Sequence, residues 1–363
     1  MRIISQLIAF VAAALVVVNF SFSEQRLVNV YNWSDYIDET ILSDFTKETG
    51  IKVVYDVFDS NEILETKLLA GKTGYDVVVP SAIFLARQIQ AGVFQPLDRS
   101  KLGNTENMWS VVRDRTAQYD PGNKYSINYM WGTTGIGYNI KEAEDRIGGP
   151  IRSWDVIFDP EKLEKFKDCG VHILDAPLEI IPAALNYLGK NPDSKKKDDL
   201  ADAGRLLKNI RSGIQKFHSS EYINALANGD ICLAVGWSGD IFQVRNRAAE
   251  ADAGVKIGYA IPNQGSMMWF DQIAIPSDAN NVSEAHEFIN YIMRPEVIAK
   301  ASNYIYYANG NKKSQTMLEK RITTDSGIYP DQSTLAKLYT TTPYDLTIQR
   351  LITRIWTKVK ANQ

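Results

Sequence analysis

Three short segments of this chain each place a tryptophan within three residues of an aspartate. Each segment ends or interrupts a strand-like apolar run, where a parallel sheet presents side chains to a crevice. Carboxylates beside aromatic faces suit a small organic cation, because the acids hold its charged ends while the rings cover its methylenes. A single pair also fits a core aromatic followed by a turn or cap aspartate, but three pairs favour a binding site. The segments are Trp33-Ser34-Asp35-Tyr36, Trp237-Ser238-Gly239-Asp240 and Trp269-Phe270-Asp271.

Motifs for other kinds of chemistry are incomplete in this sequence. The segment Gly71-Lys72-Thr73-Gly74 lacks the first glycine of a phosphate-binding P-loop, and Gly135-Ile136-Gly137 lacks the third glycine of a dinucleotide fingerprint. The three histidines stand apart from one another and from both cysteines, so a local zinc motif is absent from the sequence. We therefore expect no cofactor, no metal and no catalytic residue. A hydrolase that uses two of the carboxylates stays open as an alternative of a different class.

Composition and the N-terminus restrict where the protein works. The chain has 363 residues, is 45% hydrophobic and 23% charged, and carries a net charge of −3, which is ordinary for a globular protein. Its length favours two lobes over one core, and it lacks the basic character that a nucleic-acid partner usually requires. Residues 1–23 read as a secretory signal, with Arg2, an apolar stretch and small residues before a cleavage site after Ser23. The same segment also fits an uncleaved anchor.

Two cysteines, Cys169 and Cys232, fit an oxidising compartment. Only one intramolecular bridge is possible between them, and neither lies in a CxxC redox pair or a zinc-binding spacing. The residues alone leave two states open, a disulfide or two buried free thiols.

The first third of the chain alternates predicted strands and helices. The order is βαβαβ, which is typical of a parallel sheet with helices on its faces and predicts an α/β fold. Gly50, Gly71 and Gly92 end the three helices. The strands are expected at 27–33, 51–58 and 75–80, and the helices at 39–49, 60–70 and 82–91.

A second lobe is predicted to begin at the glycine-spaced strand 134–139, after a loop-rich stretch at 99–128. Two late strands, near 255–261 and 267–276, are expected to return the chain to the first lobe. The other elements expected after residue 139 are strands near 171–175 and 231–236, and helices near 179–188, 196–211, 221–228, 238–250, 282–293 and 343–360.

A series of longer motifs occurs in one order along the chain. They are residues 30–36 (VYNWSDY), 55–62 (YDVFDSNE), 78–81 (VVPS), 174–177 (LDAP), 217–220 (FHSS), 228–232 (NGDIC), 236–240 (GWSGD) and 307–309 (YAN). In this order they resemble the periplasmic polyamine-binding proteins of bacterial ABC importers, and most of all the putrescine-binding group among them. The likeness covers essentially the whole mature chain.

The resemblance implies a two-lobed type II periplasmic binding fold that closes on its ligand in a central cleft. The first lobe would comprise residues 24–133 and 256–305, and the second would comprise 134–255 and 306–363. The resemblance also implies that Cys169 and Cys232 form a disulfide. The ligand-binding residues that it implies are Trp33, Ser34, Asp35, Tyr36, Ser81, Glu179, Trp237, Asp240, Trp269, Asp271 and Tyr307.

Charge pairing assigns a role to each acid of this set, because a dication enters a closed cleft only if its charges are paired. Asp271 and Asp240 are expected to hold the ammonium at the main end. Glu179, with Asp35, is expected to hold the distal end, directly or through water. The walls around the methylenes would be Trp33, Trp237, Trp269 and Tyr307.

Polar residues of the set have structural alternatives. Ser34 and Ser81 can turn hydroxyl oxygens toward an ammonium group, but Ser81 follows Pro80 at a strand end and also fits a helix cap. Glu179 equally fits a first-turn helix acid that satisfies backbone N–H groups.

Two positions depart from the putrescine-binding pattern. Trp269 stands where that group has phenylalanine and resembles spermidine-preferring relatives, and Ile83 is a second difference. Putrescine is the expected ligand, with spermidine as the alternative. The resemblance implies a monomeric periplasmic receptor that delivers the polyamine to an ABC permease in the inner membrane. A receptor for amino acids would need an arginine and one for iron a tyrosine cluster, whereas aspartates and tryptophans dominate the candidate set.

Overall fold

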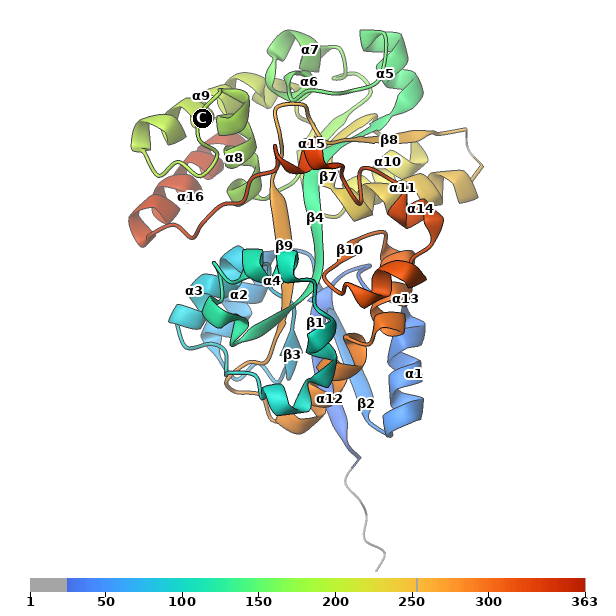
Figure 1. The fold of residues 1–363 in the computed structure, drawn as a ribbon. Coiled ribbons are helices and arrows are strands. Elements are labelled where there is room, and N and C mark those ends of the chain that lie inside the picture. Colours follow the sequence, from blue (N-terminus) through green and yellow to red (C-terminus); the bar gives the residue numbers. More distant parts are fainter. Residues whose placement is uncertain (1–24, 253, 363) are drawn as a thin grey trace, which may run out of the picture.

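A computed structural model describes residues 25–252 and 254–362, and the leader expected at residues 1–23 lies outside them. One mixed sheet runs through two lobes that lie one above the other (Figure 1). Its strand order is β2-β1-β3-β9-β4-β7-β5-β6, and β8 and β10 pair with β4. The strands are β1 (Leu27–Trp33), β2 (Lys52–Phe58), β3 (Val77–Val78), β4 (Ser126–Asn139), β5 (Val171–Ile173), β6 (Lys216–Phe217), β7 (Leu233–Trp237), β8 (Ile257–Ala260), β9 (Met268–Ala274) and β10 (Ala308–Asn309).

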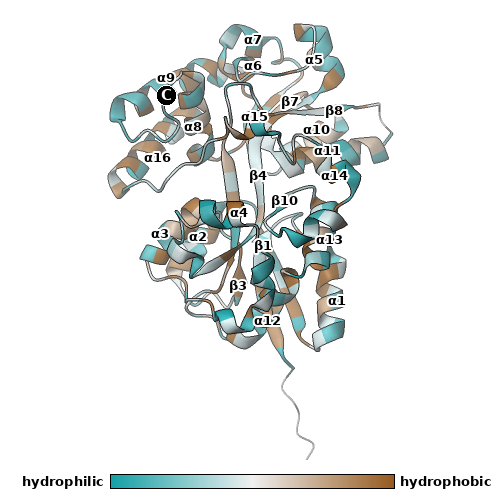
Figure 2. Ribbon diagram, viewed as in Figure 1, coloured by the Kyte–Doolittle hydropathy of each residue, from teal (hydrophilic) through white to brown (hydrophobic). Residues whose placement is uncertain are grey.

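Helices cover the sheet in both lobes. In Figure 2 strand β3 is brown and the central strand β4 is pale, and the helices carry brown and teal side by side, as expected for elements with one buried face. The helices are α1 (Glu39–Thr49), α2 (Asn61–Ala70), α3 (Ala82–Gln90), α4 (Ser110–Thr116), α5 (Ile140–Ile147), α6 (Asp155–Phe158), α7 (Pro160–Glu164), α8 (Pro177–Tyr187), α9 (Lys197–Ile210), α10 (Tyr222–Asn228), α11 (Ser238–Glu250), α12 (Val282–Ile292), α13 (Pro295–Ile305), α14 (Lys320–Thr323), α15 (Gln332–Leu335) and α16 (Leu346–Lys360).

The first lobe has the βαβαβ order that the sequence predicted, and the α/β fold class is confirmed. Strand β1 lies between β2 and β3 and is parallel to both. Helix α1 shows why the local prediction was accurate. Asp38 caps it by accepting a hydrogen bond from the Thr40 N–H, Gly50 ends it with a left-handed φ of 72°, and Ile41 and Phe45 are buried.

Strand β4 carries the sheet from one lobe into the other. Its residues 126–133 pair antiparallel with β9, and its residues 134–138 pair antiparallel with β7. Figure 1 shows β4 and β9 running between the lobes. The expectation of a loop-rich stretch at 99–128 was wrong for α4 and for the start of β4. Residues 126–133 of β4 are buried throughout, although they include the polar Asn128 and Thr133. Their sequence therefore lacks the alternation of polar and apolar residues that marks a strand with one exposed face.

Strand pairing differs from the expected lobe division at two segments. Strand β8 was expected in the first lobe, but it pairs with residues 136–139 of β4, on the edge opposite β7. Strand β10 was expected in the second lobe, but it pairs with Met130 and Trp131 of β4, on the edge opposite β9. We therefore propose that residues 25–133 and 268–317 form the first lobe, and that 134–260 and 332–362 form the second.

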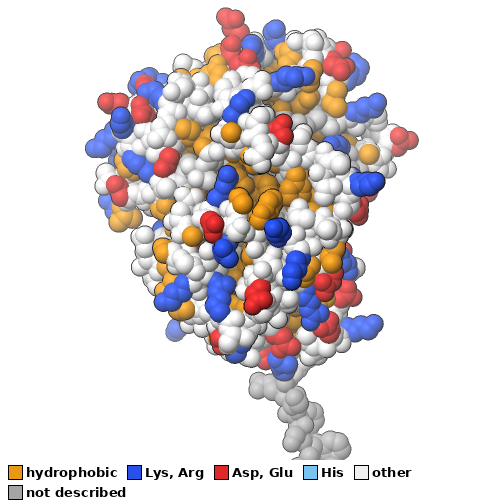
Figure 3. Space-filling model, in the orientation of Figure 1, with side chains coloured by type: hydrophobic (Ala, Val, Ile, Leu, Met, Phe, Trp, Pro, Cys, Tyr) orange, Lys and Arg blue, Asp and Glu red, His pale blue; other side chains and the backbone are white. Residues whose placement is uncertain are grey.

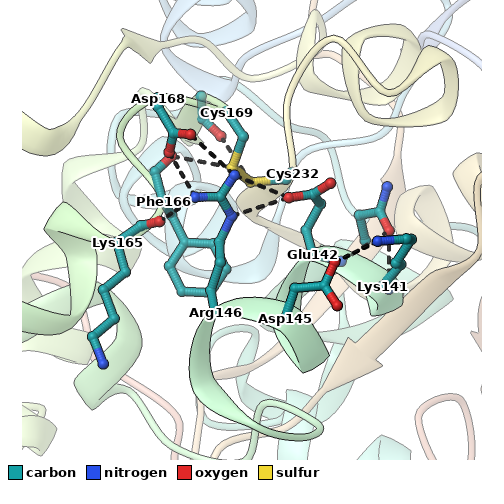
Figure 4. Close-up of polar contacts among 11 residues, drawn as sticks. Lys141, Glu142, Asp145, Arg146, Lys165, Phe166, Asp168, Cys169 and Cys232 are labelled. Atoms are coloured by element: carbon teal, nitrogen blue, oxygen red, sulfur yellow. Dashed lines mark hydrogen bonds and ion pairs between the residues drawn. A yellow bond between two sulfur atoms is a disulfide. The ribbon is translucent and has the colours of Figure 1, made fainter.

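A disulfide joins Cys169 and Cys232, with the two Cα atoms 5.7 Å apart, as the resemblance implied. The two cysteines stand just before β5 and β7, which are neighbouring parallel strands. Figure 4 shows the bridge beside Arg146, which forms ion pairs with Glu142 and Asp168. The bridge therefore ties together two strand entries at the outer end of the second lobe.

The surface carries both signs of charge in close alternation. On the face shown in Figure 3, lysine and arginine side chains lie among aspartates and glutamates, and apolar atoms gather near the centre. Within residues 25–252 and 254–362, every helix is too short or too polar to cross a bilayer.

Removing the disulfide should destabilise the protein. The bridge closes a loop with a sequence separation of 63 residues, and the chain-entropy model assigns about 4 kcal/mol to a loop of that size. We expect Cys169→Ser with Cys232→Ser to lower the free energy of unfolding in urea by about 2–5 kcal/mol. The wild type treated with a reductant is the matched control and should lose a similar amount. A double variant as stable as the oxidised wild type would contradict the expectation.

Candidate functional site

A cavity lies between the lobes, a position where small-molecule sites commonly occur. With the exception of Asp35, every ligand-binding residue implied by the resemblance lines it. The cavity also includes four residues that the sequence analysis did not select. They are Asp59, Ser219, Ser220 and Ile223. Asp59 directly follows β2, so the strand-end rule that singled out Trp33 would have found it.

The lining residues come from the ends of strands in both lobes. Trp33 ends β1 and Trp237 ends β7, while Ser81 follows β3. Glu179 and Asp240 lie in the first turns of α8 and α11. These positions are the carboxyl ends of parallel strands and the helix starts that follow them, where open α/β sheets bind ligands. The antiparallel strand β9 adds Trp269 and Asp271.

Asp271 is buried and accepts hydrogen bonds from two hydroxyl groups. The Tyr36 hydroxyl donates to Oδ2 at 2.8 Å, and the Ser81 hydroxyl donates to Oδ1 at 2.6 Å. Asn61 holds Ser81 in this role, because its amide accepts from the Ser81 N–H and donates to the Ser81 Oγ, both at 3.0 Å. Ser81 begins α3 without a side-chain cap bond, so the alternative role as a helix cap is not the one adopted.

Asp240 has a similar arrangement built from tyrosines. The hydroxyls of Tyr222 and Tyr307 donate to its two carboxylate oxygens, each at 2.7 Å. The Asp240 N–H in turn donates to the Tyr307 hydroxyl at 3.1 Å, which makes that contact reciprocal. The Trp237 N–H donates to the Tyr222 hydroxyl at 3.3 Å and orients it toward the carboxylate.

Glu179 completes the set of buried acids. The indole Nε1–H of Trp237 lies 3.0 Å from both of its carboxylate oxygens, and the Thr134 hydroxyl donates to Oε2. Thr134 belongs to β4, so the crossing strand itself supports this acid. The Glu179 carboxylate therefore bonds to a side chain of the cavity wall and to one of the crossing strand. The alternative role, an acid at a helix start, would not need these contacts.

These three acids have neutral partners only. None of them forms an ion pair with a lysine, arginine or histidine among the described residues, and six neutral donors hold them instead. Burial raises the pKa of Asp271 to about 7, of Glu179 to about 7 and of Asp240 to about 6, while the hydrogen bonds oppose that rise. Once the pH exceeds these values, the cavity holds negative charge that no positive partner among the described residues matches.

Aromatic rings form the walls around these acids. Trp33 and Trp237 face each other across the lobes with ring centroids 5.6 Å apart, in an edge-to-face arrangement. Tyr307 contacts Trp269 at 5.4 Å and Tyr36 at 5.1 Å, again edge to face. Such contacts lock the ring orientations, and the ring faces offer apolar and cation–π surface to a ligand.

Backbone geometry places Tyr307 in this wall. Helix α13 ends at Tyr306, whose left-handed φ of 63° turns the chain so that Tyr307 enters the cavity. Gly239 lies directly against the Tyr307 ring, and a Cβ at this position would overlap the ring carbons. The glycine between Trp237 and Asp240 is therefore needed for close approach of the ring.

Asp35 is the implied ligand residue that the structure does not bring into the cavity. Its φ of 54° is left-handed and its carboxylate faces outward, where Arg247 donates to it at 3.0 Å. Gln243 of the same helix, α11, donates to the Asp35 carbonyl at 3.3 Å. Asp35 belongs to the first lobe and α11 to the second, so the residue links the lobes outside the cavity.

Two lobes joined by crossing strands, with a cavity lined from both sides, define a solute-binding protein of the two-lobed class. Residues 40–329 match the family described as bacterial extracellular solute-binding protein. The chain is 51% identical over 358 residues to the putrescine-binding periplasmic protein PotF of Escherichia coli (strain K12), covering 97% of each chain. It is 49% identical over 343 residues to the putrescine-binding periplasmic protein SpuD of Pseudomonas aeruginosa (strain UCBPP-PA14), covering 94% of each.

A solved structure agrees with this assignment. The crystal structure of the spermidine/putrescine ABC transporter substrate-binding protein PotD from Streptococcus pneumoniae matches with a TM-score of 0.77 at 29% identity, over 93% of this chain and 99% of that one. The chain therefore belongs to the bacterial extracellular solute-binding proteins. As a member of this family it is a binding protein and not an enzyme, which removes the hydrolase alternative.

A methyl group at position 239 should disrupt the wall that Tyr307 forms. We expect Gly239→Ala to lower the free energy of unfolding by about 1–3 kcal/mol, because the ring must shift and its bonds to Asp240 weaken. Gly103→Ala is the matched control, since a Cβ there meets nothing within 4 Å and φ is not left-handed. Denaturant unfolding of both variants gives the comparison, and equal stabilities would contradict the role of Gly239.

Proposed function

We propose that this protein is the periplasmic polyamine receptor of a bacterial ABC importer, with putrescine as its ligand. It captures the dication in the cavity between the lobes and delivers it, as a monomer, to the permease in the inner membrane. The two relatives that share about half of its residues over nearly their whole length are both named as putrescine-binding periplasmic proteins, and this supports the choice of ligand and compartment.

The observation that carries the proposal is the pairing of buried acids with neutral donors. Asp271, Asp240 and Glu179 lack a positive partner among the described residues. A buried carboxylate without a counter-charge is costly. A ligand that brings positive charge removes that cost, whereas a sugar brings none. An amino acid would bring a carboxylate as well, and the cavity lining has no arginine to receive it.

The arrangement also offers an acid to each end of a diamine. Asp271 and Asp240, which act on each other electrostatically, would hold the first ammonium. The second would reach Glu179 directly or through water, with the methylenes between Trp33, Trp237 and Trp269. Each charge-assisted hydrogen bond contributes about 1.5–3 kcal/mol. After the cost of association, several of these are compatible with micromolar binding, about −8 kcal/mol.

Closure of the lobes follows from the same charges. Asp271 comes from β9 and Asp240 and Glu179 come from the second lobe, so a dication between them bridges both halves. Without it, the approach of these carboxylates is opposed by repulsion and desolvation. The ligand therefore stabilises the closed state because it binds that state better than the open one.

Spermidine is the second candidate ligand. A neighbouring cavity shares Trp33, Glu179, Trp237 and Trp269 with the first, and it gives a longer amine a direction in which to extend past Glu179. The larger ring of Trp269 and the branched side chain of Ile83 both line this second cavity, so both affect how a longer amine fits there. A thermal-shift comparison of putrescine, cadaverine, spermidine and spermine ranks the candidates.

Neutralising either central aspartate should weaken polyamine binding. We expect Asp271→Ala and Asp240→Ala each to reduce putrescine affinity at least about tenfold, the equivalent of losing one charge-assisted hydrogen bond. Isothermal titration calorimetry at pH 8, where both acids are ionised, measures the effect.

Asp168→Ala is the matched control, because this aspartate is exposed and pairs with Arg146 at the outer end of the second lobe. Its affinity for putrescine should stay within about twofold of the wild type, as for most surface changes away from a site. Unchanged affinity in both cavity variants would refute the proposed site.

A further inference from the structure

The three buried acids of the cavity together carry more negative charge than a diamine neutralises. When all ionised, Asp271, Asp240 and Glu179 carry three negative charges, and their hydrogen-bond partners carry no charge. A diamine brings two positive charges and a triamine brings three. A closed cavity around a diamine therefore has one negative charge too many, and an unmatched buried charge is avoided most readily by taking up a proton.

We infer that Glu179 keeps a proton when a diamine occupies the cavity and releases it to solvent when a triamine binds. This inference rests on the proposed function and makes the protonation of Glu179 a determinant of the choice between short and long polyamines. It is compatible with binding of either amine.

The position of Glu179 singles it out among the three acids. Asp271 and Asp240 lie on one connected network, because Tyr36 bonds to the first, Tyr307 bonds to the second and the two rings touch. Glu179 lies where the two cavities meet, and neither aspartate lines the second cavity. A longer amine that extends from the aspartate pair past Glu179 would therefore place its additional ammonium beside Glu179, on the side of the second cavity.

The bonding partners of Glu179 accept either protonation state. A neutral carboxyl group still accepts the Trp237 indole N–H through its carbonyl oxygen, and its O–H can donate to the Thr134 hydroxyl oxygen. The ammonium of a diamine can also donate to that carbonyl oxygen. Protonation thus removes the charge without leaving a buried polar group unpaired.

The groups around Glu179 offer no substitute for the missing positive charge. The groups that interact electrostatically with Glu179 are acids and tyrosines from five surrounding segments. They are Asp271 on β9, Glu62 on α2, Tyr222 on α10, Tyr259 on β8 and Tyr339 near the C-terminus. Arg87 and Lys360 line a third cavity, which shares Glu62 and Asp175 with the second, and there they pair with Glu65 and Asp175. Asp59 also lines the first cavity, but its side chain is partly exposed, so water screens its charge and it is left out of the count of buried acids.

Proton linkage fixes the direction of the pH effect. Below the pKa of Glu179 in the free protein, about 7, a triamine must displace one more proton than a diamine, so acid weakens its binding more. The ratio of spermidine to putrescine affinity should therefore rise with pH between pH 5.5 and 7.5, by up to about tenfold per unit. Both amines hold their full charge in this range, since amine pKa values lie higher.

Calorimetry of the wild-type protein tests this directly. Titrations with each amine in buffers of different ionisation enthalpy count the protons released. At pH 6 spermidine should release about one proton more than putrescine, in accord with the linkage relation. Equal release by the two amines would overturn the inference, whereas failure of both amines to bind would contradict the proposed function instead.

Two amide variants assign the proton to a residue. Glu179→Gln should remove the difference in proton release and lower spermidine affinity at pH 7.5 about tenfold or more, and putrescine affinity by a smaller factor. Glu62→Gln, a matched change at the second cavity, should keep the difference. If the difference survives in Glu179→Gln, or is lost in Glu62→Gln instead, the assignment to Glu179 is wrong. The wild-type titrations decide the proton count even if a variant folds poorly.

Discussion

The fold converges on one electrostatic constraint, the burial of carboxylates without a fixed counter-charge. Moving a carboxylate out of water costs several kcal/mol unless a partner compensates it. In this protein Tyr36 and Ser81 compensate Asp271 in part, and Tyr222 and Tyr307 do the same for Asp240. A lysine or arginine would compensate fully, but it would also occupy the place of a cationic ligand. Neutral donors orient the oxygens and leave the charge for the ligand to meet.

The scaffold that satisfies this constraint is simple. Parallel strands in both lobes end at the cleft, so residues that follow a strand or begin a helix reach it without special loops. Only β9 and the turn after α13 depart from this pattern. The first brings Asp271 in on a crossing strand, and the second uses the left-handed residue Tyr306 to aim Tyr307 at Asp240. Because β4 belongs to both lobes and pairs with β9 in the first and β7 in the second, one strand connects the parts of the sheet that carry these acids.

Sequence reasoning recovered the parts whose signals are local. Helix α1 has its cap, its glycine stop and its buried face within a dozen residues, and its bounds were predicted correctly. The first half of β4 was missed because its neighbours, β9 and β10, arrive from more than a hundred residues away and decide its burial. The expected lobe division differs from the strand pairing of β8 and β10 for the same reason, since strand partners at such distances leave no trace in local patterns.

The site shows the same division between local and distant information. Spacing of tryptophans and aspartates pointed to the cavity, and the resemblance supplied Ser81, Glu179 and Tyr307. The direction of Asp35 could not be inferred, because it depends on a left-handed turn and on Arg247, more than two hundred residues later. The ion pair between Asp35 and Arg247 also affects the charge balance of the cavity. An arginine across the lobes pairs with Asp35 outside the cavity, so this acid adds to closure while Arg247 opposes its effect on Asp240. The buried negative charge inside comes from the acids held by neutral donors, and their number sets how many positive charges a well-matched ligand carries.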